Sequence, residues 1–247
     1  MQVQVSEQWI DRLVGWLRDK VGEAGAKGAV FGLSGGIDSA VTAALCKRAF
    51  GSSCLGLIMP CHSNPQDEQD ARLAAEHLGI ETRTIRLDDL YDRFLGLLSL
   101  PGMETPELVK ANIKPRLRMI TLYFHAGLYS YLVVGTGNRS ELKVGYFTKY
   151  GDGGVDLLPL GNLVKSEVWR LAELLQLPQR LIEKPPSAGL WQGQTDEDEM
   201  GFSYADLDRY LLTGEAPTPL KEKIEDMDRR SAHKKLLPAI YDPHESS

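Results

Sequence analysis

Cysteine is scarce in this chain of 247 residues, which contains only Cys46, Cys54 and Cys61 and no C-x-x-C pair. This spacing excludes a disulfide framework and a cysteine-based zinc site, and it fits a reducing compartment. Apolar runs of membrane-spanning length are also missing, and the N-terminus lacks the apolar core of a signal peptide. We therefore expect a cytoplasmic protein that does not act at a membrane.

An excess of positive charge is absent as well. The chain carries 28 Lys and Arg against 34 Asp and Glu, and the net charge of −6 argues against general nucleic-acid binding. We find no internal repeat and no low-complexity linker in the sequence. The composition therefore predicts one domain over residues 1–247.

Short apolar segments alternate with segments of helical periodicity. Strands are predicted at 29–33, 53–59, 82–87 and 131–135. Helices are predicted at 5–21, from residue 40, and at 65–78, 87–98, 105–129 with an interruption at Pro115, 165–177, 203–212 and 219–229. Residues 137–161 are rich in Gly, Asp and Lys and are expected to lie outside the core. Residues 178–199 are expected to be an ordered loop over a site or a mobile lid, and a basic tail begins at residue 232. This alternation predicts an α/β fold: a doubly wound, mainly parallel sheet flanked by helices.

The first predicted strand runs into a glycine turn, Ser34-Gly35-Gly36-Ile37-Asp38-Ser39, and then into a helix of small residues. Such a turn directs backbone N–H groups and the positive end of a helix dipole at one spot, which suits a phosphate. A Walker A loop would need a Lys before its last Ser or Thr, and none is present. The turn therefore predicts a phosphate site without γ-phosphoryl transfer, and a turn without ligand is the alternative.

Two acids follow predicted strands. Asp38 follows the first, and Glu141 comes soon after the strand at 131–135, five residues beyond Thr136. In a doubly wound sheet, ligands bind at the carboxyl ends of the strands, near the switch in strand order. Because Mg²⁺ prefers a few carboxylates together with substrate oxygens, Asp38 and Glu141 are expected to share a magnesium ion bound to ATP phosphates. Glu141 as a solvated loop acid is the alternative.

The turn SGGIDS resembles the pyrophosphate loop of the N-type ATP pyrophosphatases, which cleave ATP between its α and β phosphates. Further motifs extend the likeness over nearly the whole chain: NIKPRLRM at 112–119, GTGNRSE at 135–141, FTKYGDGG at 147–154, LLPLGNLVKSEV at 157–168 and a His-Lys pair at 233–234. Together they resemble the ammonia-dependent NAD⁺ synthetases, which adenylate the nicotinate carboxylate of deamido-NAD⁺ and then amidate it.

This resemblance implies a ligase of the last step of NAD⁺ biosynthesis, with a Rossmann-like fold of the adenine nucleotide alpha-hydrolase type. The products would be NAD⁺, AMP and pyrophosphate. The residues implied to bind ATP are Ser34, Gly35, Gly36, Ile37, Asp38, Ser39, Thr136, Lys165 and Ser187. The residues implied to bind deamido-NAD⁺ are Arg116, Lys149, Asp156, His233 and Lys234. Asp38 and Glu141 would hold Mg²⁺, Asp38 and Lys165 would be catalytic, and the enzyme would be a homodimer.

The chain departs from the common bacterial pattern of this family at two motifs. It has GTGNRSE in place of GTDHAAE, and Pro186-Ser187-Ala188-Gly189 in place of PTAD. Ser187 keeps a hydroxyl, whereas Gly189 lacks the family's carboxylate. Only 28 residues precede the first predicted strand, so we expect no fused glutaminase domain. Free ammonia, or ammonia from a separate chain, is the expected nitrogen source.

Two other functions remain open from the residues alone. One is a different pyrophosphatase-loop enzyme, such as a ligase resembling GMP synthetase or a tRNA-modifying ligase; the acidity and the lack of a basic appendage argue against tRNA. The other is a non-catalytic nucleotide-binding module of the universal-stress type. Such a module would not need Asp38, Glu141, Lys165 and the FTKYGDGG segment together.

Overall fold

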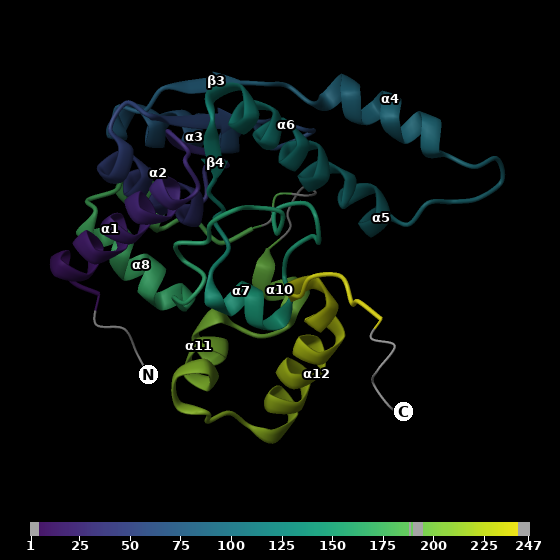
Figure 1. The fold of residues 1–247 in the computed structure, drawn as a ribbon. Coiled ribbons are helices and arrows are strands. Elements are labelled where there is room, and N and C mark those ends of the chain that lie inside the picture. The colour runs from purple at the N-terminus through teal and green to yellow at the C-terminus, as the bar shows by residue number, and fades with distance from the viewer. Residues whose placement is uncertain (1–4, 188, 190–194, 242–247) are drawn as a thin grey trace.

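A four-stranded parallel sheet forms the centre of the computed structural model, which describes residues 5–187, 189 and 195–241 (Figure 1). The strands lie in the order β3-β2-β1-β4, with bounds β1 Gly28–Gly32, β2 Cys54–Ile58, β3 Thr82–Thr84 and β4 Tyr131–Val133. Since β2 and β3 extend from one side of β1 and β4 lies on the other, the strand order switches between β1 and β4. The predicted doubly wound α/β fold is confirmed.

Helices connect these strands and cover the sheet. The bounds up to β4 are α1 Glu7–Glu23, α2 Ile37–Phe50, α3 Pro65–Leu78, α4 Asp88–Leu98, α5 Glu107–Ala111 and α6 Ile113–Tyr129. After β4 they are α7 Arg139–Val144, α8 Lys165–Leu174, α9 Gln179–Ile182, α10 Asp196–Met200, α11 Tyr204–Thr213 and α12 Thr218–Lys235. In the part of the chain that the structure describes, no helix combines the length and apolarity needed to cross a bilayer.

The two faces of the sheet pack against different helices. Ala29 and Phe31 of β1 face a core with α1, α2 and α8, whereas Val30 faces a core with α6. This alternation follows from the two-residue period of a strand, and burial of both faces is typical of a parallel sheet. A third apolar cluster joins α7, α10, α11 and α12 around Tyr204, below the sheet in the view of Figure 1.

Two predicted helix boundaries in the first half differ from the structure by three residues. The helix after the glycine turn begins at Ile37 rather than Ala40, so Asp38 lies in its first turn. The stretch 105–129 breaks at Asn112 rather than at Pro115, which lies in the first turn of α6. Proline is tolerated there because the first N–H groups of a helix have no intrahelical partner.

The later segments contain more helix than predicted. α7 lies in the segment 137–161, where no helix was predicted, and its start carries a capping box in which Asn138 and Glu141 bond each other's backbone N–H. α9 lies inside the expected loop 178–199, and α10 begins inside it and ends at Met200. α12 runs to Lys235, so the expected basic tail is partly its last turn, where cations suit the helix dipole.

Candidate active site

The glycine turn at the carboxyl end of β1 is shaped in advance for an anion. Gly35 has a φ of +80°, and a Cβ on it would lie 2.4 Å from the carbonyl oxygen of Asp67, so this position requires glycine. Ser39 Oγ donates to the Gly36 carbonyl (2.8 Å) and accepts from the Ser34 N–H (3.2 Å). No side chain caps the start of α2, so its first N–H groups remain available to a phosphate.

An ion cluster of Asp38, Glu141 and Lys165 lies beside this turn. Lys165 Nζ is 2.5 Å from Asp38 Oδ2 and 3.6 Å from Glu141 Oε1, and the lysine side chain is only 2% exposed. Asn138 contacts both acids, because its Nδ2 donates to Asp38 Oδ1 (2.9 Å) and its backbone N–H to Glu141 Oε2 (3.2 Å). The structure thus brings the two predicted magnesium ligands and the predicted catalytic lysine together.

Carboxylates outnumber cations in this cluster. Asp196 is a third acid and is itself buried, and its Oδ2 accepts from the Tyr204 hydroxyl at 2.9 Å. Burial, followed by repulsion from Asp38, raises the pKa of Glu141 to about 8, and burial also raises the pKa of Asp196. Burial lowers the pKa of Lys165, but the carboxylates of Asp38 and Glu141 outweigh this effect and leave that pKa raised. The cluster therefore keeps Lys165 protonated and favours a further cation.

The donor chemistry of the cluster fits a magnesium ion. Asp38 and Glu141 supply hard carboxylate oxygens, and Mg²⁺ commonly takes one or two of these and completes its shell with water and phosphate oxygens. Among residues 5–187, 189 and 195–241, no group of three or more His, Cys, Asp or Glu side chains is arranged to hold a metal. A magnesium ion on these two acids would therefore need oxygens from a bound nucleotide.

The turn and the ion cluster border one cavity of about 440 Å³, which is within the usual size of small-molecule sites. Its walls include the carboxyl ends of β1, β2 and β4, as expected at the switch in strand order. The predicted site residues that line it are Ser34, Ile37, Asp38, Ser39, Thr136, Glu141, Lys165, Ser187 and Lys234. Gly35 and Gly36 complete the turn at its edge.

Three predicted dinucleotide-binding residues lie outside this lining, linked to one another. Arg116 donates to the carbonyl oxygen of Lys149 (3.3 Å), and Lys149 Nζ donates to the carbonyl oxygen of His233 (2.6 Å). Lys234, next in the chain, lines the cavity and donates to the carbonyl oxygens of Gly145 and Phe147. The end of α12 is thereby attached to the segment that carries the FTKYGDGG motif.

Asp156 lies apart from the cavity. Its carboxylate accepts from the Val133 N–H (2.8 Å) and from the Tyr123 hydroxyl of α6 (3.1 Å). The structure therefore does not bring Asp156 together with the other predicted site residues within this chain.

Arg118 is a cavity residue that the sequence prediction did not assign. Its Nε donates to the Met59 carbonyl (3.1 Å) and its guanidinium to Ser63 Oγ (3.2 Å), at the carboxyl end of β2. It stands two positions after Arg116 in α6, and side chains at that spacing leave a helix in different directions. That spacing could have shown that only one of the two arginines can face the cavity.

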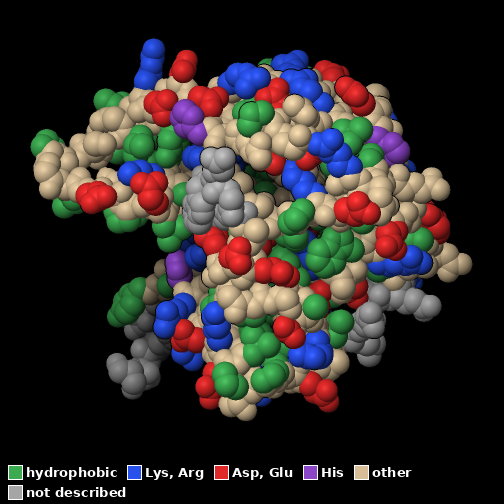
Figure 2. All heavy atoms as spheres, turned by 180° about the vertical axis from the view of Figure 1, so that it is seen from behind, with side chains coloured by type: hydrophobic (Ala, Val, Ile, Leu, Met, Phe, Trp, Pro, Cys, Tyr) green, Lys and Arg blue, Asp and Glu red, His purple; other side chains and the backbone are tan. Residues whose placement is uncertain are grey.

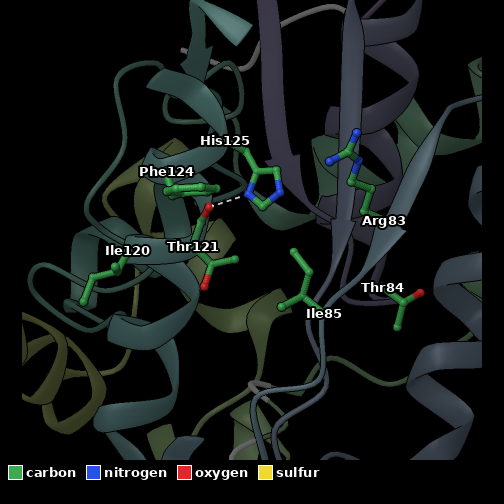
Figure 3. Close-up of a pocket in the computed structure, with 7 residues that line it drawn as sticks. All are labelled: Arg83, Thr84, Ile85, Ile120, Thr121, Phe124 and His125. Carbon is green, nitrogen blue, oxygen red and sulfur yellow. Dashed lines mark hydrogen bonds between the residues drawn. The ribbon is translucent and has the colours of Figure 1, made fainter. Parts of the chain in front are cut away.

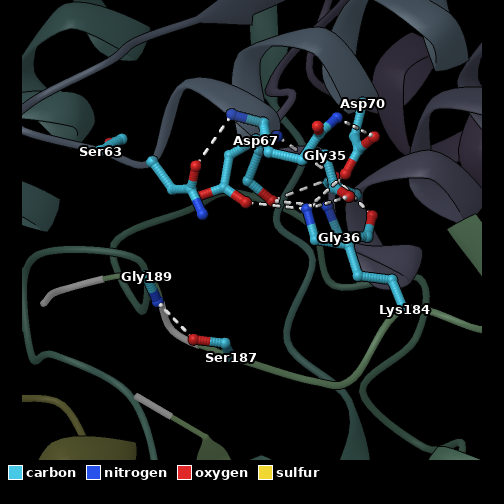
Figure 4. Close-up of polar contacts among 12 residues, drawn as sticks. Gly35, Gly36, Ser63, Asp67, Asp70, Lys184, Ser187 and Gly189 are labelled. Atoms are coloured by element: carbon cyan, nitrogen blue, oxygen red, sulfur yellow. Dashed lines mark hydrogen bonds and ion pairs between the residues drawn. The ribbon is translucent and has the colours of Figure 1, made fainter. Parts of the chain in front are cut away.

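Lys184 is a second cation that sequence reasoning missed. Figure 4 shows it reaching toward the glycine turn, where Nζ donates to the Gly35 carbonyl (3.1 Å), Asp67 Oδ1 (2.8 Å) and Asp70 Oδ2 (2.8 Å). Ser187 lies apart from this cluster in the same view. The segment that carries Ser187 is thus fastened to the glycine turn, although no motif in the sequence marks Lys184.

Comparison with known proteins places these features in a family. The family model described as NAD synthase matches residues 9–238. An NH(3)-dependent NAD(+) synthetase of Carboxydothermus hydrogenoformans is 56% identical over 95% of this chain and 97% of its own length.

Two solved structures share the fold at comparable coverage. The structure of NMN synthetase from Francisella tularensis has a TM-score of 0.91 and 42% identity, covering 97% of this chain and all of that one. The NH3-dependent NAD synthetase from Campylobacter jejuni, in complex with the nitrate ion, has a TM-score of 0.79 and 33% identity, covering 96% of this chain and all of that one. The chain therefore belongs to the NAD synthase family of ligases.

Proposed function

We propose that this chain amidates the nicotinate carboxyl group of deamido-NAD⁺ with ammonia, at the expense of ATP, through an acyl-adenylate. The observation that carries the proposal is the convergence of the glycine turn, two carboxylates and Lys165 on one cavity at the sheet's switch point. The name of the C. hydrogenoformans relative supports ammonia as the nitrogen donor. One synthetase domain over residues 1–247 and a cytoplasmic location remain predictions.

The proposed reaction has two steps, because a carboxylate would have to expel oxide if ammonia attacked it directly. First, a carboxylate oxygen bonds to the α-phosphorus of ATP, the bond from that phosphorus to the α–β bridging oxygen breaks, and pyrophosphate leaves. Ammonia then attacks the acyl carbon, AMP leaves with the electrons of the C–O bond, and the nitrogen loses a proton. The turn at 34–39 would hold pyrophosphate, and Lys165 would stabilise charge on the α-phosphate.

Magnesium on Asp38 and Glu141 is part of this proposal. When bound, it would offset phosphate charge and orient the nucleotide. Thr136 and Ser187, whose hydroxyl-bearing side chains line the same cavity, are proposed to contact ATP.

Arg116, Lys149, His233 and Lys234 are proposed to bind the acceptor. Arg116 and Lys149 are linked to each other and to the backbone of His233, and Lys234 lines the cavity, so three cations gather at this end of α12, which suits a ligand with phosphates. Asp156 is proposed to serve the same acceptor from the side of α6, where a second copy of the chain would complete the site.

A second acceptor is also supported. The F. tularensis structure is described as an NMN synthetase, and nicotinate mononucleotide carries the same carboxyl group as deamido-NAD⁺. The proposed chemistry is identical for both, so kcat/KM values measured with each acceptor under matched Mg-ATP and ammonium would decide between them. A ratio above about tenfold would identify the better substrate, since that factor equals about 1.4 kcal/mol of transition-state binding.

The products distinguish this proposal from other nucleotide chemistry. With either acceptor, Mg-ATP and ammonium, we expect AMP and pyrophosphate in equal amounts to the amide product, measured by chromatography and a pyrophosphate assay. The physical reason is that the turn lacks the lysine that would follow a transferred γ-phosphoryl group. Without ammonium, pyrophosphate should still be released as the acyl-adenylate forms. ADP and orthophosphate as main products would contradict the proposal.

We further propose that the enzyme is a homodimer built on an exposed apolar face of α4, α5 and α6. Figure 1 shows α4 and α5 projecting from the body of the molecule, and Figure 2 shows hydrophobic side chains along this arm. The large apolar side chains exposed on these helices and on the segment that joins α4 to α5 are Leu90, Phe94, Leu97, Leu98, Leu100, Met103, Leu108, Val109, Ile120, Tyr123, Phe124 and Leu128. Beside them, Figure 3 shows an open groove between β3 and α6, lined by Arg83, Ile85, Phe124 and His125 among others. An apolar face of this extent supports a protein interface.

Charge placed on this face should separate the copies. Phe124→Asp is expected to convert a dimer of about twice 27.4 kDa into a monomer, measured by light scattering at the assay concentration. Leu237→Asp, at a residue 90% exposed outside this face, is the matched control and should leave the mass unchanged. A fully active monomeric parent protein would refute the dimer.

A further inference from the structure

Lys165 occupies an unfavourable place for a cation, because it is the first residue of α8. The positive end of the helix dipole disfavours a positive charge there, and the side chain is almost fully buried. The N-cap residue Val164 has no polar side chain to receive the first N–H groups of the helix. The start of α8 therefore needs an acceptor from elsewhere in the fold.

Asp208 of α11 supplies that acceptor from 43 residues further along the chain. Its Oδ2 accepts from the Ser166 N–H (2.7 Å), and its Oδ1 accepts from the Lys165 N–H (3.3 Å) and from Ser140 Oγ (2.6 Å). Asp208 is buried, with only 3% of its surface exposed. Ser140 immediately precedes Glu141. The buried carboxylate of Asp208 therefore links the start of α8, which carries Lys165, to the segment of α7 that carries Glu141.

Tyr204 supports the same lysine from one turn earlier on α11. Residues four apart share a helix face, so Tyr204 and Asp208 both point at the start of α8. The Tyr204 ring centre lies 5.0 Å from Lys165 Nζ, and its hydroxyl donates to Asp196. Asp208 thus fixes the backbone of Lys165, and Tyr204 lies beside its ammonium group.

We propose that Asp208 is a positioning residue for the reaction, which sets the positions of Lys165 and Glu141 relative to each other. The proposal rests on the proposed function of that site. Asp208 does not line the described cavity, so it acts through Lys165 and Glu141 rather than on substrate.

The three partners of Asp208 all donate hydrogen bonds, and this makes Asp208→Asn an informative substitution. An amide of the same shape offers one oxygen acceptor and directs an NH₂ group at a remaining donor. The start of α8 should then shift, while the volume of the packed side chain is unchanged.

The test is a double-mutant cycle of Asp208→Asn and Lys165→Ala, with kcat, KM for ATP and melting temperature measured for each protein. We expect Asp208→Asn alone to lower kcat at least tenfold with KM changed less than threefold. In the Lys165→Ala background the same substitution should lower kcat less than threefold, because its effect passes through the missing lysine. Asp206→Asn, at an acid 43% exposed on the same helix, is the control and should retain kcat.

Losses that multiply in the double mutant, or a raised KM with unchanged kcat, would overturn the proposal. If Asp208→Asn does not fold, Ser140→Ala removes the Ser140 bond to Asp208 and also the bond that Ser140 Oγ accepts from the Lys165 N–H (3.1 Å). This variant should still lower kcat without raising KM, and a normal kcat would overturn the proposal equally. Failure of the parent protein to turn over either acceptor would reject the proposed function instead. In that case the same double-mutant cycle would be measured as ATP affinity. Effects of Asp208→Asn and Lys165→Ala on ATP affinity that add independently would overturn the positioning role of Asp208.

Discussion

Replacing Lys165 by alanine is expected to lower kcat by about 100- to 1,000-fold, the usual effect of removing one preorganised group that stabilises transition-state charge. The ammonium lies in a water-poor cluster beside the turn that would hold pyrophosphate, where its interaction with phosphoryl oxygens is weakly screened. Adenylation should be the step that slows. Pyrophosphate–ATP exchange measured with acceptor and without ammonium isolates that step, and acceptor affinity should change less than threefold.

A matched control separates this effect from a general loss of positive charge. Lys20→Ala removes a lysine that pairs with Glu23 on the surface of α1, and it should leave kcat unchanged. Lys165→Ala must also be shown to fold, because it leaves Asp38 and Glu141 without their cation. A folded Lys165→Ala protein with kcat within threefold of the parent value would reject the proposed role.

The sequence was most informative where local pattern and tertiary structure agree. The strand before the glycine turn and the helix at 65–78 could be predicted because apolar periodicity and helix-ending residues such as Gly79 act over a few positions. The approach of Asp38 to Glu141 was also predictable, because parallel strands bring their carboxyl ends to one edge of the sheet.

Other features depend on contacts that no local pattern shows. α7 was missed because its segment is rich in Gly and Asp, which are poor helix formers, yet Val144 of this helix packs in the cluster around Tyr204. The basic residues at 233–235 were predicted to form a tail. They form the last turn of α12 instead, and Lys234 and Lys235 donate to carbonyl groups of residues 143–147. Lys184 lacked a motif, because its role comes from tertiary packing between distant segments.

Glu141→Gln is expected to raise the stability of the metal-free protein and to lower its activity. Burial and the charge of Asp38 raise the pKa of Glu141 in the folded protein to about 8, above its usual value near 4.5. Between these values the folded state binds more protons than the unfolded state, so this group makes stability fall as pH rises. A neutral amide removes the cost of holding the ionised Glu141 carboxylate in the folded protein. The metal-free variant should therefore melt at a higher temperature than the parent protein at pH 7.5.

The same substitution should weaken the enzyme, because it removes one of the two carboxylates proposed to hold magnesium. We expect the Mg²⁺ concentration for half-maximal activity to rise at least about tenfold, by analogy with losses at metal sites, and kcat to fall about 100-fold. Glu173→Gln, at a glutamate 52% exposed on α8, is the control and should change neither quantity. Unchanged magnesium dependence in Glu141→Gln would reject its role as a ligand.

Asp38→Asn should differ from Glu141→Gln in one respect, and the difference tests how the cluster is built. Asp38 is the nearer partner of Lys165, at 2.5 Å against 3.6 Å, so its neutralisation leaves a buried ammonium with weaker compensation. Asp38→Asn should therefore lower the melting temperature of the metal-free protein, whereas Glu141→Gln should raise it. Both variants should require more Mg²⁺ and turn over slowly. If the two variants shift the melting temperature in opposite directions and both lose activity, the extra carboxylate serves to bind the cation of the nucleotide. Equal shifts of the melting temperature would contradict that assignment.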